Sequence, residues 1–258
     1  MNRKQGPAYR DRQFLESGDG RPVRILAEYL KPLAALRDAG VQDTIVFFGS
    51  ARLAPDGPLG RYYTDARELA RAITEWSESL HRASRRFVVC SGGAGGIMEA
   101  ANRGAADAGG RTLGLNIGLP HEQRPNPYIS PELNFEFRYF FMRKLWFAHL
   151  ARAMIAFPGG FGTLDEVFEI LTLSQTRKLS RPIPVLLYGS NYWREVINFG
   201  ALVNHGMIDK RDRALFHYVD TTSEALEILK DELERIVDEP APSLAGSTCP
   251  GPKTADGA

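Results

Sequence analysis

The 258-residue sequence is poor in cysteine, in net charge and in long apolar runs, and each shortage excludes a class of protein. Two cysteines, Cys90 in an apolar run and Cys249 in a Pro/Gly-rich segment, cannot build a disulfide framework, which favours a reducing compartment. The 32 basic and 31 acidic side chains give a formal charge of +1, too little for binding a nucleic-acid backbone. Because no apolar run approaches the roughly 18 residues of a membrane helix and the polar N-terminus lacks a signal-peptide core, we expect a cytoplasmic protein that does not bind membranes.

From residue 44 onward, short β-rich runs alternate with amphipathic helices. This alternation predicts an α/β fold, in which helices cover both faces of a mostly parallel sheet. The expected strands are Thr44–Phe48, Arg86–Cys90, Thr112–Ile117, Ala153–Phe157, Ile183–Tyr188 and Phe216–Val219. The expected helices are Tyr62–His81, Ile97–Ala108, Phe141–Ala151, Thr163–Arg177, Tyr192–His205 and Ser223–Val237.

The segments outside this alternation have their own patterns. Residues 21–43 carry apolar side chains at helical spacing and predict an N-terminal helical extension. Residues 1–20 and the Pro/Gly-rich residues 239–258 are expected to be disordered. Residues 44–238 then form one domain.

Three strand-to-helix turns are unusually rich in glycine. They contain Gly49 and Ser50; Gly92, Gly93, Gly95 and Gly96; and the segment Pro158 to Glu166. Ligands of an open parallel sheet bind beyond the carboxyl ends of its strands, where glycine permits close approach and helix N-termini favour anions. One such turn can be plain turn geometry, but three together predict an anion site.

The sequence of these turns disfavours two common nucleotide sites, those of dinucleotide dehydrogenases and of P-loop NTPases. The second turn does not match the G-x-G-x-x-G dinucleotide fingerprint, and no turn carries a Walker A lysine. The five histidines are dispersed without metal-ligand spacing. We therefore expect a mononucleotide or another small phosphate ester, bound without a metal.

The third turn, Pro158-Gly159-Gly160-Phe161-Gly162-Thr163-Leu164-Asp165-Glu166, resembles the P-G-G-x-G-T-x-x-E signature of the Lonely Guy (LOG) family. Met142-Arg143-Lys144 is similar to the family's R-K pair, and Gly92 to Met98 is similar to its G-G-x-x-G-x-M turn. LOG proteins are cytokinin riboside 5′-monophosphate phosphoribohydrolases, often mislabelled as lysine decarboxylases. The long bacterial members resemble this chain better than the short plant enzymes do.

The resemblance implies a modified Rossmann fold, a homodimer and hydrolysis of the N-glycosidic bond of AMP or N6-substituted AMP, with no cofactor. It makes residues 44–238 the nucleotide-binding catalytic domain, and Arg143 and Glu166 the catalytic pair. The substrate-binding residues that it implies are Gly49, Ser50, Gly92, Gly93, Gly95, Gly96, Glu99, Glu122, Lys144, Pro158, Gly159, Gly160, Phe161, Gly162 and Thr163.

The chemistry of the bond fits these residues but leaves their roles open. Cleavage builds positive charge on the ribose, so Glu166 could stabilise that charge, orient the attacking water or hold the ribose hydroxyls. Purely structural roles are alternatives. Thr163 and Glu166 have capping-box spacing, Arg143 could be a solvated helix residue, and Glu99 a first-turn acid favoured by the helix dipole.

Two other functions remain to be weighed. A non-catalytic carrier of a phosphorylated ligand, similar to molybdenum-cofactor carriers, would use the same glycine turns. A pyridoxal-phosphate decarboxylase would need a Schiff-base lysine. Lys144 is the only lysine beside the expected site, and its neighbour Arg143 is better explained by nucleotide binding. The decarboxylase hypothesis is therefore the least favoured of the three.

Overall fold

The computed structural model describes residues 6–80, 86–118, 124–179, 181, 183–235 and 237. Its centre is a seven-stranded sheet of order β4-β3-β2-β1-β5-β6-β7 in which every pairing is parallel. The strands are β1 (Thr44–Phe48), β2 (Val88–Ser91), β3 (Thr112–Ile117), β4 (Asn134–Phe137), β5 (Ala151–Ala156), β6 (Val185–Tyr188) and β7 (Phe216–Val219). The predicted Rossmann-like α/β fold is confirmed.

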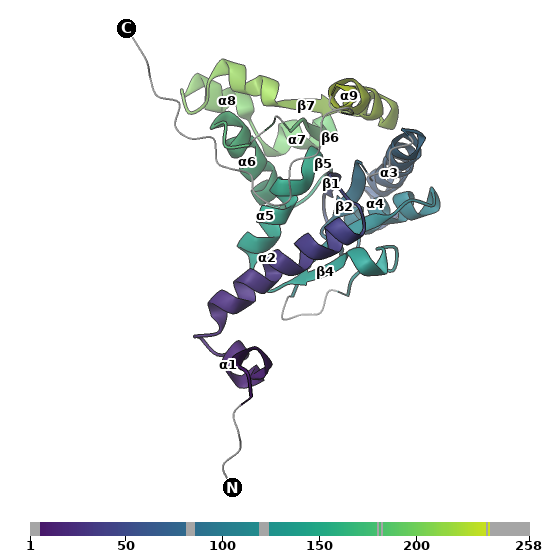
Figure 1. Ribbon diagram of the computed structural model, residues 1–258. Coiled ribbons are helices and arrows are strands. Elements are labelled where there is room, and N and C mark those ends of the chain that lie inside the picture. The colour runs from purple at the N-terminus through teal and green to yellow at the C-terminus, as the bar shows by residue number, and fades with distance from the viewer. Residues whose placement is uncertain are drawn as a thin grey trace.

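Helices cover both faces of the sheet (Figure 1). One face carries α3 (Gly60–Ser79), α4 (Ile97–Asp107) and α9 (Thr222–Glu234); the other carries α2 (Arg21–Asp38), α5 (Phe140–Leu150), α6 (Phe161–Gln175), α7 (Ser190–Val196) and α8 (Phe199–Asn204). Among the described residues, no helix is long and apolar enough to cross a membrane.

The central strand β1 is buried on both faces. Ile45 and Phe47 belong to one apolar cluster, whereas Val46 and Phe48 belong to the other. Successive strand residues point to opposite faces, so an uninterrupted apolar run is what a strand between two helix layers requires.

The expected N-terminal helix is confirmed as α2, and it packs into the core. Leu36 is fully buried, and the Tyr29 ring stacks on Trp146 with centroids 5.5 Å apart. The Trp146 indole donates to the Glu28 carbonyl at 3.1 Å, while the Glu28 carboxylate accepts the Arg138 amide at 2.8 Å. Helix α2 therefore holds the segment that leads from β4 into α5.

The expectation of disorder over residues 1–20 is wrong for residues 8–16, which form the 3-10 helix η1 (Ala8–Arg10) and helix α1 (Arg12–Glu16). Asp11 caps α1 by accepting the Phe14 amide at 3.1 Å, and Arg24 of α2 donates to the Ser17 carbonyl at 2.8 Å. Polar contacts rather than a buried apolar stripe hold this segment, so hydrophobic periodicity does not reveal it. The tail at 239–258 lies outside the described residues.

Two further elements differ from the sequence-based expectation. Strand β4 was not expected; it is a four-residue edge strand with alternating exposure, preceded by the 3-10 helix η2 (Pro131–Leu133). The single helix predicted for Tyr192–His205 is two helices, α7 and α8. The break falls where the Asn198 side chain caps α8 by accepting the Ala201 amide at 2.9 Å. A 3-10 helix, η3 (Lys210–Leu215), then leads into β7.

Removing the buried side chain of α2 tests whether that helix belongs to the cooperative core. Leu36→Ala should lower the free energy of unfolding by about 2–5 kcal/mol, because it leaves a cavity at a fully buried site. Leu30→Ala on the same helix is the matched control, since Leu30 is 54% exposed. Urea unfolding followed by circular dichroism measures both. Equal, small losses in the two variants would show that α2 is peripheral.

Candidate functional site

The three glycine turns follow β1, β2 and β5, which are the three neighbouring strands at the centre of the sheet. The strand order changes direction at β1, because β2 to β4 lie on one side of it and β5 to β7 on the other. Such a switch point opens a crevice at the carboxyl ends of the strands. The turns are therefore gathered where the sequence predicts a ligand.

The backbone of Ser50 joins the three turns to one another. Its amide donates to the Pro158 carbonyl at 3.0 Å, and its carbonyl accepts the Ile97 amide at 3.1 Å. The Ser50 hydroxyl accepts the Arg52 amide at 3.1 Å. One residue thus fixes the first turn against both others.

Two glycines of the second turn have left-handed backbones. Gly93 has φ of 76° and Gly96 has φ of 63°. A Cβ at Gly93 would collide with the Asn116 amide, and one at Gly96 with the Ser50 carbonyl. Only glycine fits at these two positions, so backbone geometry alone accounts for them.

Helix α6 begins at Phe161, directly after Gly160, and no side-chain hydrogen bond caps it in the described structure. The capping-box alternative for Thr163 and Glu166 is wrong, because Thr163 is the third residue of the helix and Glu166 lies in its second turn. The first amides of a helix lack carbonyl partners and carry its positive dipole end. The uncapped turn is therefore available to an anion, and a Cβ at Gly159 would collide with Thr163.

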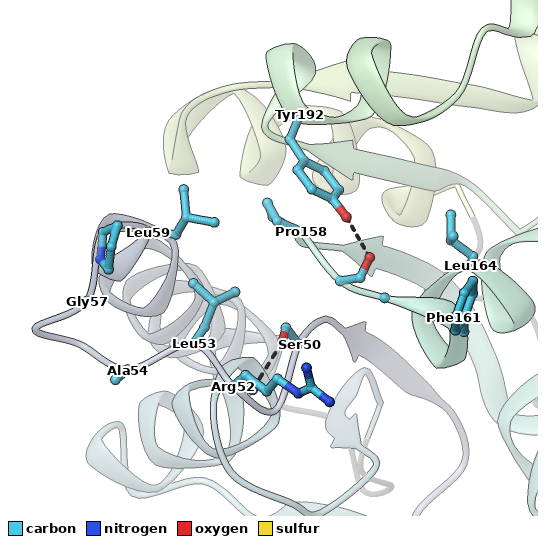
Figure 2. A pocket seen from close by; sticks show the side chains of 13 residues that line it. Ser50, Arg52, Leu53, Ala54, Gly57, Leu59, Pro158, Phe161, Leu164 and Tyr192 are labelled. Carbon is cyan, nitrogen blue, oxygen red and sulfur yellow. Dashed lines mark hydrogen bonds between the residues drawn. The ribbon is translucent and has the colours of Figure 1, made fainter.

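A pocket of about 750 Å³ opens beside this turn (Figure 2). Ser50 and Arg52 line one side, and Pro158, Phe161 and Tyr192 line the other. The remaining lining is mainly apolar (Leu53, Ala54, Gly57, Pro58, Leu59, Gly159, Gly160, Leu164). The Tyr192 hydroxyl donates to the Gly159 carbonyl at 2.6 Å, which holds the third turn in place.

Arg143 and Glu166 do face each other, as expected of a pair, but they lie outside this pocket. The Arg143 Nη2 and Glu166 Oε1 atoms are 3.5 Å apart, and the two side chains are 14% and 5% exposed. A Cβ at Gly92 would lie 3.9 Å from Arg143 Nη1, so the pair adjoins the second glycine turn. The alternative that Arg143 is a solvated helix residue is wrong.

One hydrogen-bond donor of the Arg143 guanidinium has no partner among the described residues. The guanidinium lies over the Phe140 and Phe147 rings, 5.3 and 5.6 Å from their centroids, and the unpaired donor is its buried Nε. A buried unpaired donor costs free energy, which a ligand acceptor would recover. Burial also lowers the pKa of Arg143. The negative charges of Glu166 and Asp165 raise this pKa, but by less than burial lowers it.

Glu166 is the most strongly perturbed acid of the site. Burial raises its pKa to about 7, although the positive charges of Arg143 and Lys144 pull it down. Near neutral pH the carboxyl can therefore either hold or release a proton, which suits a group that takes a proton from water.

Lys144 is engaged with the exposed side of α6. Its ammonium lies 2.8 Å from Asp165 and 3.2 Å from Glu169. Burial lowers the pKa of Lys144, but the hydrogen bonds to these two carboxylates outweigh it, so the net shift is upward. A raised pKa disfavours the neutral amine that Schiff-base formation needs.

The predicted contact Glu99 is engaged by a neighbouring helix. The Glu99 carboxylate accepts the Tyr63 hydroxyl of α3 at 2.9 Å. Glu122 lies outside the described residues, and its role stays a prediction. No group of three or more His, Cys, Asp or Glu side chains in the described part of the chain could hold a metal ion.

Sequence reasoning missed the polar network beneath the second turn. The buried Asn126 amide donates to the Gly93 and Ala94 carbonyls at 3.1 Å, and to Asn102 at 2.9 Å. Asn102 in turn accepts the Ser91 hydroxyl at 2.6 Å. Asn102 stands four residues after Met98 on the inner face of α4, but Asn126 has no local signal, because only the fold brings its loop to the turn.

Known proteins share both sequence and fold with this chain. The family model described as "possible lysine decarboxylase" matches residues 98–229, just over half of the chain. The probable cytokinin riboside 5′-monophosphate phosphoribohydrolase LOGL3 of Oryza sativa subsp. japonica is 30% identical over 198 residues, which cover 75% of this chain and 84% of that protein. The chain belongs to the LOG family.

Other LOG relatives include a bacterial one. The cytokinin riboside 5′-monophosphate phosphoribohydrolase of Rhodococcoides fascians is 30% identical over 143 residues, covering 52% of this chain and 67% of that protein. Among solved structures, TM1055 has a TM-score of 0.53 at 22% identity, covering 73% of this chain and 99% of its own. The molybdenum cofactor carrier protein of Chlamydomonas reinhardtii has a TM-score of 0.50 at 20% identity, and the match covers 74% of this chain and 99% of that protein. These two likenesses show the fold.

The pKa of Glu166 predicts a pH-dependent stability. Its ordinary value of 4.5 applies to the unfolded chain, whereas the folded value is about 7. At a pH between these two pKa values, Glu166 is protonated in the native state but ionised in the unfolded state. The free energy of unfolding therefore falls as pH rises. Relative to Glu166→Gln, the wild type should lose up to about 3 kcal/mol between pH 4 and pH 8.

Urea unfolding at several pH values measures this difference. Glu75→Gln is the control, because Glu75 is 53% exposed in an ion pair with Arg71. A stability difference between wild type and Glu166→Gln that does not change with pH would contradict the raised pKa.

Proposed function

We propose that this chain is a nucleoside 5′-monophosphate phosphoribohydrolase. Its substrate is AMP or an N6-substituted AMP such as a cytokinin riboside monophosphate, and its products are the free base and ribose 5-phosphate. The observation that carries the proposal is the uncapped start of α6, with a buried Arg143–Glu166 pair one turn further on. Residues 44–238 form the catalytic domain, which uses no cofactor.

The phosphate binds at the start of α6. The amides from Phe161 to Thr163 and the positive dipole end of the helix favour a dianion there. The second glycine turn supplies further backbone at the start of α4, which is also uncapped by side chains. With the phosphate so held, the ribose reaches Glu166 on the same helix.

Glu166 handles the charge and the proton of the reaction. As the C1′–N bond breaks, its electron pair goes to the base nitrogen, and the ribose gains oxocarbenium character that the carboxylate stabilises. Water adds to C1′ and gives a proton to Glu166, which passes it on to the departing base nitrogen and so returns to its starting state. The balance is one water consumed for each bond broken.

Arg143 and Lys144 hold this arrangement in place. Arg143 fixes the carboxylate of Glu166 and offers its unused Nε to a substrate oxygen. Lys144 is a positioning residue, since its two ion pairs join α5 to the outer side of α6.

A carrier of a phosphorylated ligand is the second candidate function. The pocket of about 750 Å³ touches the third turn but does not include Arg143 or Glu166. A ligand held mainly there would bind without meeting the pair. Binding of AMP with no release of base would favour this carrier over the hydrolase.

Product analysis tests the hydrolase. Wild-type protein incubated with AMP should release adenine and ribose 5-phosphate in equal amounts, measured by liquid chromatography with mass spectrometry. Glu166→Gln and Arg143→Ala should each lower kcat by about 10²-fold or more, because both act on charge in the transition state.

An exposed Arg–Glu pair provides the matched control. Arg71 and Glu75 on α3 are 3.0 Å apart but 51% and 53% exposed. Arg71→Ala and Glu75→Gln should leave kcat within about twofold, as solvated ion pairs contribute little. Loss of activity in the control variants as large as in the site variants would reject the assignment of Arg143 and Glu166.

We also propose that the working form is a homodimer, as the LOG family resemblance implies. Large apolar side chains are exposed on α5 and α6: Phe140, Phe141 and Leu145 on the first, Phe161 and Phe168 on the second. Sedimentation equilibrium should give twice the chain mass of 28.6 kDa. Phe141→Glu should weaken the dimer, whereas Met207→Glu should not, since Met207 is 68% exposed in the bend after α8. A monomer mass for the wild type would refute the dimer.

A further inference from the structure

A second cavity lies at the opposite end of the sheet from the glycine turns. It has a volume of about 610 Å³ and lies where β5, β6 and β7 begin. Arg152 at the start of β5, Pro184 before β6 and Leu215 before β7 all line it. The end of α6 contributes Ser174, and the end of α9 contributes Arg235.

Positive charge is concentrated around this cavity. Four arginines line it (Arg152, Arg177, Arg181, Arg235), against one lining acid, Glu232, and Arg152 is also ion-paired at 3.5 Å with the buried Asp43. The whole chain has a formal charge of only +1, so the cluster does not reflect a generally basic surface. Like charges around a low-dielectric hollow repel one another and attract small anions from solution.

Neighbouring groups are consistent with such a field. Burial and the charge of Arg152 both lower the pKa of His149. The Ser174 hydroxyl oxygen is buried and has no hydrogen-bond partner among the described residues. A bound oxyanion would accept from this hydroxyl and from the planar forks of the arginines.

We propose that this cavity is a second ligand site, which binds a small polyanion bearing phosphate or carboxylate groups. Arg177, Arg181 and Arg235 form its charged wall, with Arg152 at the start of β5 and Ser174 as a neutral donor. Helix α6 runs between the two sites, and its 15 residues span roughly 22 Å. The ligand is therefore separate from the proposed substrate, and the inference does not depend on the proposed function.

Titration calorimetry on the full chain tests the site, with pyrophosphate and citrate as separate probes at constant ionic strength. Removing two exposed lining charges, Arg177→Asn with Arg235→Gln, should weaken the binding of at least one probe by tenfold or more. Asparagine is chosen because Arg177 has φ of 54°, which asparagine tolerates. Unchanged thermal unfolding would confirm that the double variant folds.

The control removes two exposed arginines elsewhere, Arg37→Gln with Arg71→Gln, and should change either affinity by less than twofold. The probe whose binding is lost identifies the ligand class, phosphate or carboxylate. Saturable binding that is equal in the wild type and in the Arg177/Arg235 variant would overturn the proposal, because it would place the anion at the glycine turns instead. Absence of saturable binding of both probes to the wild type would overturn it too.

Discussion

The two backbone hydrogen bonds of Ser50 are the contacts on which the site depends. They tie the turn after β1 to the turn after β5 and to the start of α4, at 3.0 and 3.1 Å. Each partner turn then leads into a helix whose start has no side-chain cap, although the Ile97 amide of α4 is bonded to Ser50 itself. Because the three strands are neighbours, two helix N-termini converge on one crevice, and their dipoles add for a bound anion.

The position of Arg143 follows from contacts much further away. Arg143 lies on α5, and α5 is held through Trp146, which stacks on Tyr29 and donates to the Glu28 carbonyl of α2. The same helix brings Phe147 under the guanidinium. Helix α2 thus helps to hold the helix that carries the arginine, which links the stability of α2 to the geometry of the Arg143–Glu166 pair.

Sequence patterns anticipated the fold and the turns because both depend on local chemistry. The apolar run from Thr44 to Phe48 and the glycines before α4 need only their own neighbours to be interpreted. Burial of the Arg143–Glu166 pair and the placement of Asn126 under Gly93 depend on packing between segments far apart in the chain. The capping-box interpretation failed because α6 starts at Phe161, two residues before Thr163, which moves Glu166 from the first turn of the helix to the second.

Helix α6 and strand β5 each extend from one edge of the sheet to the other along the strand direction. The groups around their two ends differ. At one end they supply uncapped amides and a buried carboxyl, and at the other Arg152 and Ser174 line a cavity among arginines. We propose an anion site at each end, with a different means of binding. Backbone dipoles would bind the anion at the first end, where glycine leaves the main chain bare, whereas side-chain charge would have to do so at the second, where the carboxyl end of α6 has the unfavourable dipole sign. The carboxyl end of α6 favours cations, so the helix dipole itself helps to place Arg177 there, and an anion bound at this end has to be held by arginine side chains rather than by backbone amides.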